Sequence, residues 1–273
     1  MEFLIFREAI VIIAAGIAAW TDLKTGEIPN WLNYPLIALG VLFNLVFFDA
    51  WALGIGAAIF AIGYLLYYSG KIGGGDVKLF SGLALVMPFI NGTAFILPVL
   101  LYSALIAVVF LSTYYLVKLI RLRKFNLKEN LKGILNAGII GIFLIAYFAI
   151  MLNSGFFQMQ NALVLAVPLA FALVFLALEK SIRKNFFLKS VKLKDLEEDE
   201  LIALEFLPEK VQKRINLKMK RIIDKQLVEE LKKEKISEVL VYRDLPRFAP
   251  FILAGVILAI LKPELVAGIF TLQ

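Results

Sequence analysis

The residues of this chain best suited to chemistry are two aspartates beside turn-forming segments of an apolar sequence. Asp22 follows the first long apolar run, and Asp76 follows three consecutive glycines. One carboxylate can take a proton from water while a second, protonated carboxyl donates one, so an aspartate pair suits acid–base hydrolysis. The chain has no His and no Cys. This excludes His-based triads, thiol nucleophiles and the usual zinc sites of His and Cys.

The elements that must position these aspartates are indicated by the composition. Of 273 residues, 61% are hydrophobic and 19% charged, and the mean hydropathy is +0.84. Soluble domains are only about 45–50% apolar. A water-soluble core could not bury this much apolar surface, so we expect an all-α polytopic membrane protein.

Charge is concentrated in one block of the chain. Residues 179–247 hold 18 of the 29 Lys and Arg and 14 of the 22 Asp and Glu. We expect a membrane body over 1–178, a small α+β cytoplasmic insertion over 179–247 and a final transmembrane helix within 248–273. Alternating residues predict strands at 190–196 and 237–245, with a helical pattern at 208–235 between them. The basic surface of this insertion is expected to contact lipid headgroups. The insertion has no pattern typical of nucleic-acid binding.

Apolar runs predict about eight transmembrane helices. The expected ranges are 3–20, 31–48, 52–69, 77–90, 93–119, 134–152, 160–178 and 249–270. The run 77–90 is short, at about 21 Å for 1.5 Å per residue, against a hydrocarbon layer of ~30 Å. The first run has neither a basic start nor a clear cleavage site, so we expect a mature helix rather than a signal peptide.

Basic loops predict the orientation. Lys and Arg lie in the loops 21–30, 70–78 and 120–133, whereas the loops 49–51, 91–92 and 153–159 have none. Basic loops favour the cytoplasmic side. This predicts a cell-membrane protein whose aspartates and insertion face the cytoplasm and whose termini are both outside.

Each aspartate also has an ordinary structural interpretation. Asp76 would be a favoured residue at a helix N-cap, and Asp22 could be a solvated interfacial residue. Asp22 is predicted to lie at the C-terminus of a helix, where the partial negative charge of the helix dipole disfavours a carboxylate. If the short helix reaches the outer interface near Ile90, Asp76 lies below the cytoplasmic interface, where a charge is expensive.

The segment Gly73-Gly74-Gly75-Asp76-Val77-Lys78-Leu79 resembles the G-x-G-D-hydrophobic-K motif of type IV prepilin peptidases, a family that includes archaeal preflagellin peptidases. Asp22, followed seven residues later by Pro29-Asn30, resembles the first-loop pattern of the same family. The resemblance implies a membrane aspartic protease in which Asp22 and Asp76 match the catalytic pair. It implies no cofactor and no metal.

The resemblance also implies roles for the neighbouring residues. Gly73 and Gly75 would supply backbone geometry, and Pro29 and Asn30 would set the start of the second helix. Lys78 would either act on Asp76 by its charge or extend to the lipid headgroups.

The implied substrate is a type IV pilin-like precursor, with a short basic leader on the cytoplasmic side and an apolar helix after it. Glu27 is a candidate partner for the basic leader. A second candidate is the acidic run Glu197, Glu198, Asp199 and Glu200, although such a run is more often a solvated helix start.

Other interpretations remain open from the sequence. Many bacterial members carry a Cys-rich segment and N-methylate their product, and the absence of Cys here argues against methyltransferase activity. Asp22 and Asp76 could instead couple protons or cations in a transporter. A presenilin-like protease shares the GxGD string, but its Tyr-Asp element does not occur here. The identity of the precursor and the oligomeric state are left open.

Overall fold

Apolar helices make up most of the chain. The structure, a computed structural model, describes residues 2–123, 127–155, 159–196, 200–203, 223, 225–233, 236, 238–243 and 245–263. Five of its helices are long and apolar enough to cross a membrane, and shorter apolar helices pack among them. The prediction of an all-α, multi-pass membrane protein is confirmed.

Each of the eight predicted apolar runs contains a helix. The helices are α1 (Glu2–Thr25), α2 (Asn30–Val46), α3 (Ala50–Tyr68), α4 (Gly74–Val86), α5 (Ile96–Arg121), α6 (Leu127–Asn153), α7 (Met159–Ile182) and α10 (Ala249–Leu261). The long spans are α1, α3, α5, α6 and α7.

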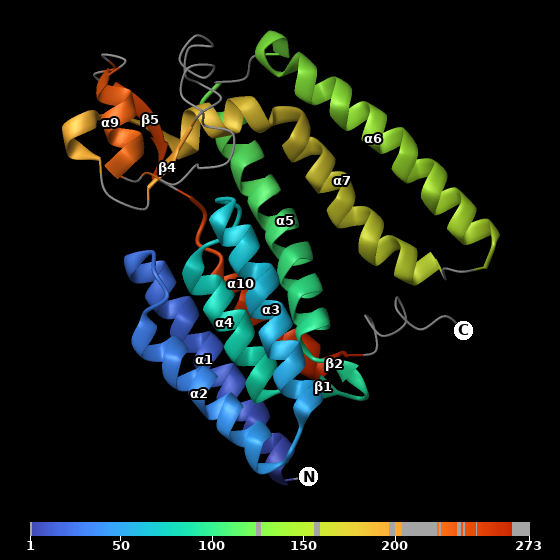
Figure 1. Ribbon diagram of the computed structural model, residues 1–273. Helices are drawn as coiled ribbons and strands as arrows, with labels where there is room; N and C mark the ends of the chain where they lie inside the picture. Colours follow the sequence, from blue (N-terminus) through green and yellow to red (C-terminus); the bar gives the residue numbers. More distant parts are fainter. Residues whose placement is uncertain are drawn as a thin grey trace.

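The central helix of the bundle is α4, which packs between α2 and α3 (Figure 1). Val77 and every residue from Leu79 to Val86 are buried. With 13 residues it is about 20 Å long at 1.5 Å per residue, too short to cross the bilayer unaided. Because other helices surround α4 on all sides, it contacts protein where a full-length transmembrane helix would contact lipid.

The expected extension of this helix to residue 90 is wrong. Helix α4 ends at Val86, because Pro88 disfavours helical geometry in the preceding residue Met87. Strands β1 (Phe89–Ile90) and β2 (Thr93–Ala94) then form a hairpin. Asn91 and Gly92 have φ values of 48° and 80°, as a two-residue type I′ turn requires.

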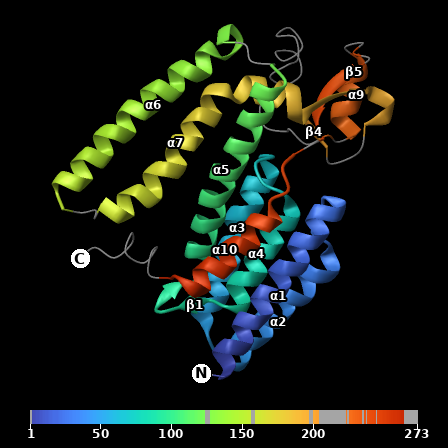
Figure 2. The same ribbon diagram turned by 180° about the vertical axis from the view of Figure 1, so that it is seen from behind.

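Helix α10 packs between α1 and α5, so the end of the chain returns to the start of the bundle (Figure 2). Small residues of α1 at helical spacing, Val11, Ala14, Ala15 and Ala18, share one buried cluster with Ile252, Val256 and Ala259 of α10. At the far end, the Tyr102 hydroxyl of α5 donates to the Lys262 carbonyl at 2.6 Å.

Helices α6 and α7 form a hairpin that projects from α5 (Figure 1). At its base, Asn130 Nδ2 donates to Ser181 Oγ, and the Ser181 N–H donates to Asn130 Oδ1 at 3.2 Å. Most of the apolar surface of α6 is exposed in the isolated chain. In a membrane protein such a surface faces lipid.

The charged insertion forms a small α+β unit. Strands β3 (Leu188–Lys192), β5 (Glu238–Tyr242) and β4 (Leu201–Ile202) form an antiparallel sheet in the order β3-β5-β4, and Leu188 and Lys192 pair with Tyr242 and Glu238. A π-helix (Arg183–Phe187) leads into β3, and a short 3₁₀ helix (Leu193–Asp195) follows it. Helix α9 (Lys225–Lys233) packs Leu227 and Leu231 into the core of the unit. Within the predicted helical segment 208–235, residues 208–222 lie outside the described residues.

The connections between the helices α1 to α5 alternate between the two ends of the bundle. The C-terminus of α1, the α3–α4 loop, the C-terminus of α5 and the α+β unit of the insertion, called the soluble unit below, all lie at one end (Figure 1). Lys24, Lys71 and Arg121 are among their basic residues. The α2–α3 loop and the β1–β2 hairpin lie at the other end.

Candidate active site

Asp22 lies in the last turn of α1 and is 7% exposed. Its Oδ2 accepts a hydrogen bond from the backbone N–H of Ala249, the first residue of α10, at 3.0 Å. The first N–H groups of a helix have no partner within it and carry partial positive charge. Helix α10 therefore offsets the unfavourable dipole of α1 at this carboxyl group.

A glycine turn ends α1 directly after Asp22. Gly26 has a φ of +84° and donates its N–H to the Asp22 carbonyl at 2.8 Å. Glycine adopts this left-handed conformation without the strain that other residues incur. The exposed Arg247 guanidinium lies against Gly26, where a Cβ would overlap it. The chain that enters α10 thus lies against the Asp22 turn at Arg247 and is hydrogen-bonded to Asp22 through Ala249.

Asp76 is the third residue of α4, whose N-cap is Gly73. The Asp76 carboxylate folds back beside the Gly73 backbone, where a Cβ on Gly73 would lie 2.9 Å from Asp76 Oδ2. Asp76 holds the position from which the third residue of a capping box faces the N-cap. Asp76 is therefore not the N-cap itself.

The structure brings Asp22 and Asp76 to one site. Helices α1 and α4 are in contact, and the charge of Asp22 acts on the Asp76 carboxyl group. Asp22 is buried and Asp76 is partly exposed. Two carboxyl groups near enough for their charges to interact can divide the roles of base and acid.

The segment after Asp22 holds the start of α4. A Cβ on Gly75 would lie 3.1 Å from Ile28 Cβ and 3.4 Å from the Ile28 carbonyl oxygen, so a larger residue would push against Ile28. Pro29 is the N-cap of α2, and Asn30 is its first residue. This loop and the glycine segment together place α4 beside the Asp22 turn.

Asn33 is a residue of this site that the sequence did not single out. It is fully buried, and its Nδ2 donates to the Gly75 carbonyl at 3.3 Å. Its Oδ1 is buried without a hydrogen-bond partner among the described residues. An amide three residues after Asn30 in an otherwise apolar run was the available signal, because buried amides commonly join membrane helices.

Lys78 makes its contacts with α2. Its Nζ donates to Asn30 Oδ1 at 2.7 Å, lies 3.4 Å from the Tyr34 hydroxyl and lies 5.0 Å from the centre of the Tyr34 ring. Lys78 makes no ion pair with Asp76 in the described structure. Its geometry is that of a side chain joining α4 to the N-terminus of α2.

The acidic residues that the sequence offers as partners of a basic leader lie in different parts of the structure. Glu27 is exposed in the loop between Asp22 and Pro29. Glu200 lies in the soluble unit and pairs with Arg243, while Glu197, Glu198 and Asp199 lie outside the described residues. Within the described part of the chain, no three acidic side chains gather as a metal site would require.

A polytopic helical protein that gathers two aspartates at one end of its bundle has the arrangement of a two-carboxylate hydrolase. Residues 9–112 match the model of the type IV leader peptidase family, so this part of the chain is similar to that family. This match includes Asp22, Pro29, Asn30 and the segment from Gly73 to Lys78.

The chain is also similar to a protein named prepilin peptidase EppA from Methanothermobacter thermautotrophicus. The two are 40% identical over 88 residues, which cover 29% of this chain and 23% of that protein. The similarity thus spans less than a quarter of the length of the relative. No solved structure matches the chain significantly. The family match favours a peptidase over a transporter.

Proposed function

We propose that the protein is an aspartic endopeptidase that removes the short basic leader from type IV pilin-like precursors, prepilin or preflagellin, at the cytoplasmic face of the membrane. The observation that carries the proposal is the convergence of Asp22 and Asp76 within the region that is similar to the type IV leader peptidase family. The name of the relative supports this class of substrate.

Two neighbouring carboxyl groups suffice for the reaction. Both cannot ionise without mutual repulsion, so the pair shares one proton. The ionised aspartate takes a proton from water as the water oxygen attacks the scissile carbonyl, and the protonated aspartate hydrogen-bonds to that carbonyl oxygen. When the C–N bond breaks, a carboxyl proton passes to the leaving amine, and the pair returns to its starting state.

The proposed orientation follows from the ends of the bundle. The site shares its end with the basic loops and the soluble unit (Figure 1), and basic loops favour the cytoplasmic side. Both termini would then lie outside. A basic leader reaching the site from the cytoplasm would meet the exposed Glu27 beside Asp22. Residues 1–178 would form the membrane body, 179–247 the soluble insertion and 248–273 the segment containing the last helix.

The test uses membranes that contain wild-type or variant protein, mixed with a precursor that has a basic leader and an apolar helix. We expect Asp22→Asn and Asp76→Asn each to lower processing by at least about 10²–10⁴-fold, the range of general acid–base contributions. Processing is measured from the shortened product on a gel.

Asp49→Asn is the matched control. Asp49 Oδ1 caps α3 at the opposite end of the bundle, accepting from Ala52 N–H at 2.9 Å, and Asn caps helices equally well. The control should process the precursor normally. Processing that survives in both Asp22→Asn and Asp76→Asn would rule out the aspartate pair, and loss of proton-coupled uptake in the same variants would favour a transporter instead.

A further inference from the structure

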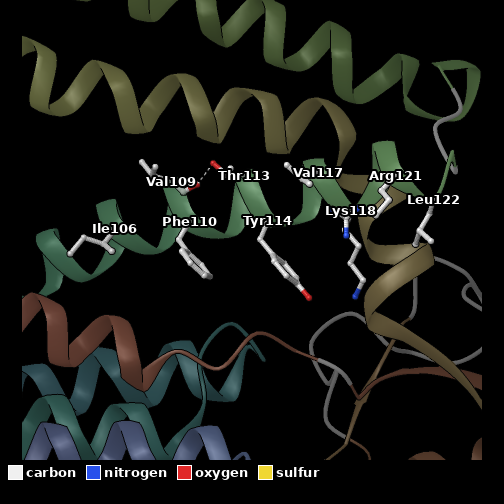
Figure 3. A pocket seen from close by; sticks show the side chains of 9 residues that line it. All are labelled: Ile106, Val109, Phe110, Thr113, Tyr114, Val117, Lys118, Arg121 and Leu122. Atoms are coloured by element: carbon white, nitrogen blue, oxygen red, sulfur yellow. Dashed lines mark hydrogen bonds between the residues drawn. The ribbon is translucent and has the colours of Figure 1, made fainter.

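A groove of about 890 Å³ runs along α5, away from the two aspartates. In Figure 3, α5 forms its floor, Val109, Thr113 and Val117 extend toward α7, and Phe110 and Tyr114 extend toward α10 and the chain that enters it. The described residues that line it are Ile106, Val109, Phe110, Thr113, Tyr114, Val117, Lys118, Arg121 and Leu122. All of these residues belong to α5 or, in the case of Leu122, to its C-cap, so the groove follows one face of this helix.

The groove is apolar along its length and basic at one end. The Thr113 hydroxyl donates to the Val109 carbonyl of its own helix, so the hydrogen of this hydroxyl is not available to a ligand. Lys118 and Arg121 lie in the last turn of α5, and none of the described residues that line the groove is acidic. The Lys118 ammonium lies 4.8 Å from the Phe186 ring centre and 5.5 Å from that of Tyr114. Neither cation has an acidic partner among the described residues.

The dimensions fit one leaflet of a bilayer. Twelve residues separate Ile106 from Lys118, a rise of about 18 Å in an α-helix, and one leaflet contributes about half of a ~30 Å hydrocarbon layer. Since α5 is long enough to span the membrane, Lys118 and Arg121 lie at headgroup depth on the side of the soluble unit.

We propose that this groove is a binding site for an anionic phospholipid of the leaflet that faces the soluble unit. One acyl chain lies along Val109, Phe110 and Val117, and the headgroup phosphate contacts Lys118 and Arg121. Two cations at the end of an apolar groove complement an anionic amphiphile and repel a helix that begins with a basic leader. The lipid covers the apolar face of α5 that lines the groove.

The test measures lipid binding and is independent of proteolysis. The purified chain in detergent is titrated with phosphatidylglycerol or phosphatidylcholine, and bound lipid is counted by native mass spectrometry. At about 1 kcal/mol per cation, Lys118→Gln should weaken phosphatidylglycerol binding about fivefold and Lys118→Gln/Arg121→Gln about 30-fold. Phosphatidylcholine should bind more weakly and change less.

Lys71→Gln/Lys132→Gln is the matched control, since it removes two exposed cations from the same end but outside the groove. It should leave phosphatidylglycerol binding unchanged. Thr113→Trp fills the groove without changing charge and should displace both lipids, which also tests the site if the double variant fails to fold. Equal loss in the groove variants and the control, or equal binding of both lipids by wild type, would overturn the proposal. Weakened binding of a precursor's apolar helix with lipid binding intact would assign the groove to substrate.

Discussion

The carboxyl group of Asp22 combines a structural contact with its proposed chemistry. It lies where the dipole of α1 disfavours negative charge, and the Ala249 N–H of α10 offsets this. One oxygen is held by this hydrogen bond, and no hydrogen bond to the other oxygen is found among the described residues. The last helix therefore positions a residue that lies 227 positions earlier in the chain.

The two contributions of Asp22 can be separated by substitution. Asp22→Asn keeps an amide oxygen that accepts from Ala249 N–H, so we expect a small change in thermal stability. Asp22→Ala leaves the buried Ala249 N–H at the N-terminus of α10 without an acceptor. This should lower the free energy of unfolding by about 1 kcal/mol, as the loss of a helix cap does. Both should abolish processing. Thermal unfolding in detergent and the precursor assay measure the two effects, and equal unfolding temperatures would show that the hydrogen bond contributes little to stability.

Gly73 is expected to position Asp76 because the carboxylate folds back onto its backbone. A Cβ at residue 73 would lie 2.9 Å from Asp76 Oδ2, tighter than normal contacts, so Gly73→Ala should displace the carboxyl group. We expect at least about a tenfold loss of kcat, since small misplacements of catalytic groups are costly. Gly54→Ala is the control, because nothing lies within 4 Å of a Cβ at that helical position. A normal kcat in Gly73→Ala would mean that Asp76 tolerates displacement.

At the scale of elements, α2 holds α4 at both ends through two buried amides. Asn33 Nδ2 donates to the Gly75 carbonyl in the first turn of α4, and Asn44 Nδ2 donates at 2.8 Å to the Leu85 carbonyl in the last turn. The last carbonyls of a helix have no partner within it, so the Asn44 bond satisfies a group that would otherwise be unpaired. This pair fixes the position of a helix that is too short to be set by the bilayer.

The two amides allow a matched comparison. Asn33→Leu and Asn44→Leu each remove one buried hydrogen bond to α4, and both should lower stability by about 1–2 kcal/mol. Only Asn33→Leu should also lower kcat, because Gly75 is adjacent to Asp76 whereas Leu85 is nine residues beyond it. Unfolding temperatures and steady-state kinetics on both variants test this. Equal kinetic defects in the two variants would contradict a local positioning role for Asn33.

The positions of the helices could be predicted from hydropathy, because the apolar runs together contain more apolar surface than a soluble core can bury. The end of α4 was missed because the apolar run continues through Phe89 and Ile90, and Pro88 and the Asn91–Gly92 turn decide the local structure. In the site, the two aspartates could be identified from their motifs. The contact between Asp22 and Ala249 could not be predicted, because no local sequence pattern indicates which distant helix begins beside α1.

At the scale of the whole molecule, the soluble unit enters and leaves the bundle at neighbouring points. Leu188 at the start of β3 pairs with Tyr242 at the end of β5, and the Arg243 N–H donates to the Phe187 carbonyl at 3.2 Å. The two ends of the insertion are therefore one strand spacing apart, about 5 Å. Most of the unit can be removed without moving either α7 or the start of α10.

This geometry defines a deletion that tests the role of the insertion. Residues 189–241 are replaced by a short Gly-Ser turn that joins Leu188 to Tyr242. Because Ala249 and Arg247 remain against the Asp22 turn, we expect the helices to stay folded and kcat to stay within about threefold of wild type. If the unit binds the leader, KM for the precursor should rise while cleavage continues. Loss of kcat in a variant that still folds would instead show that the unit holds α10 against Asp22, since no other described contact of the insertion reaches the two aspartates.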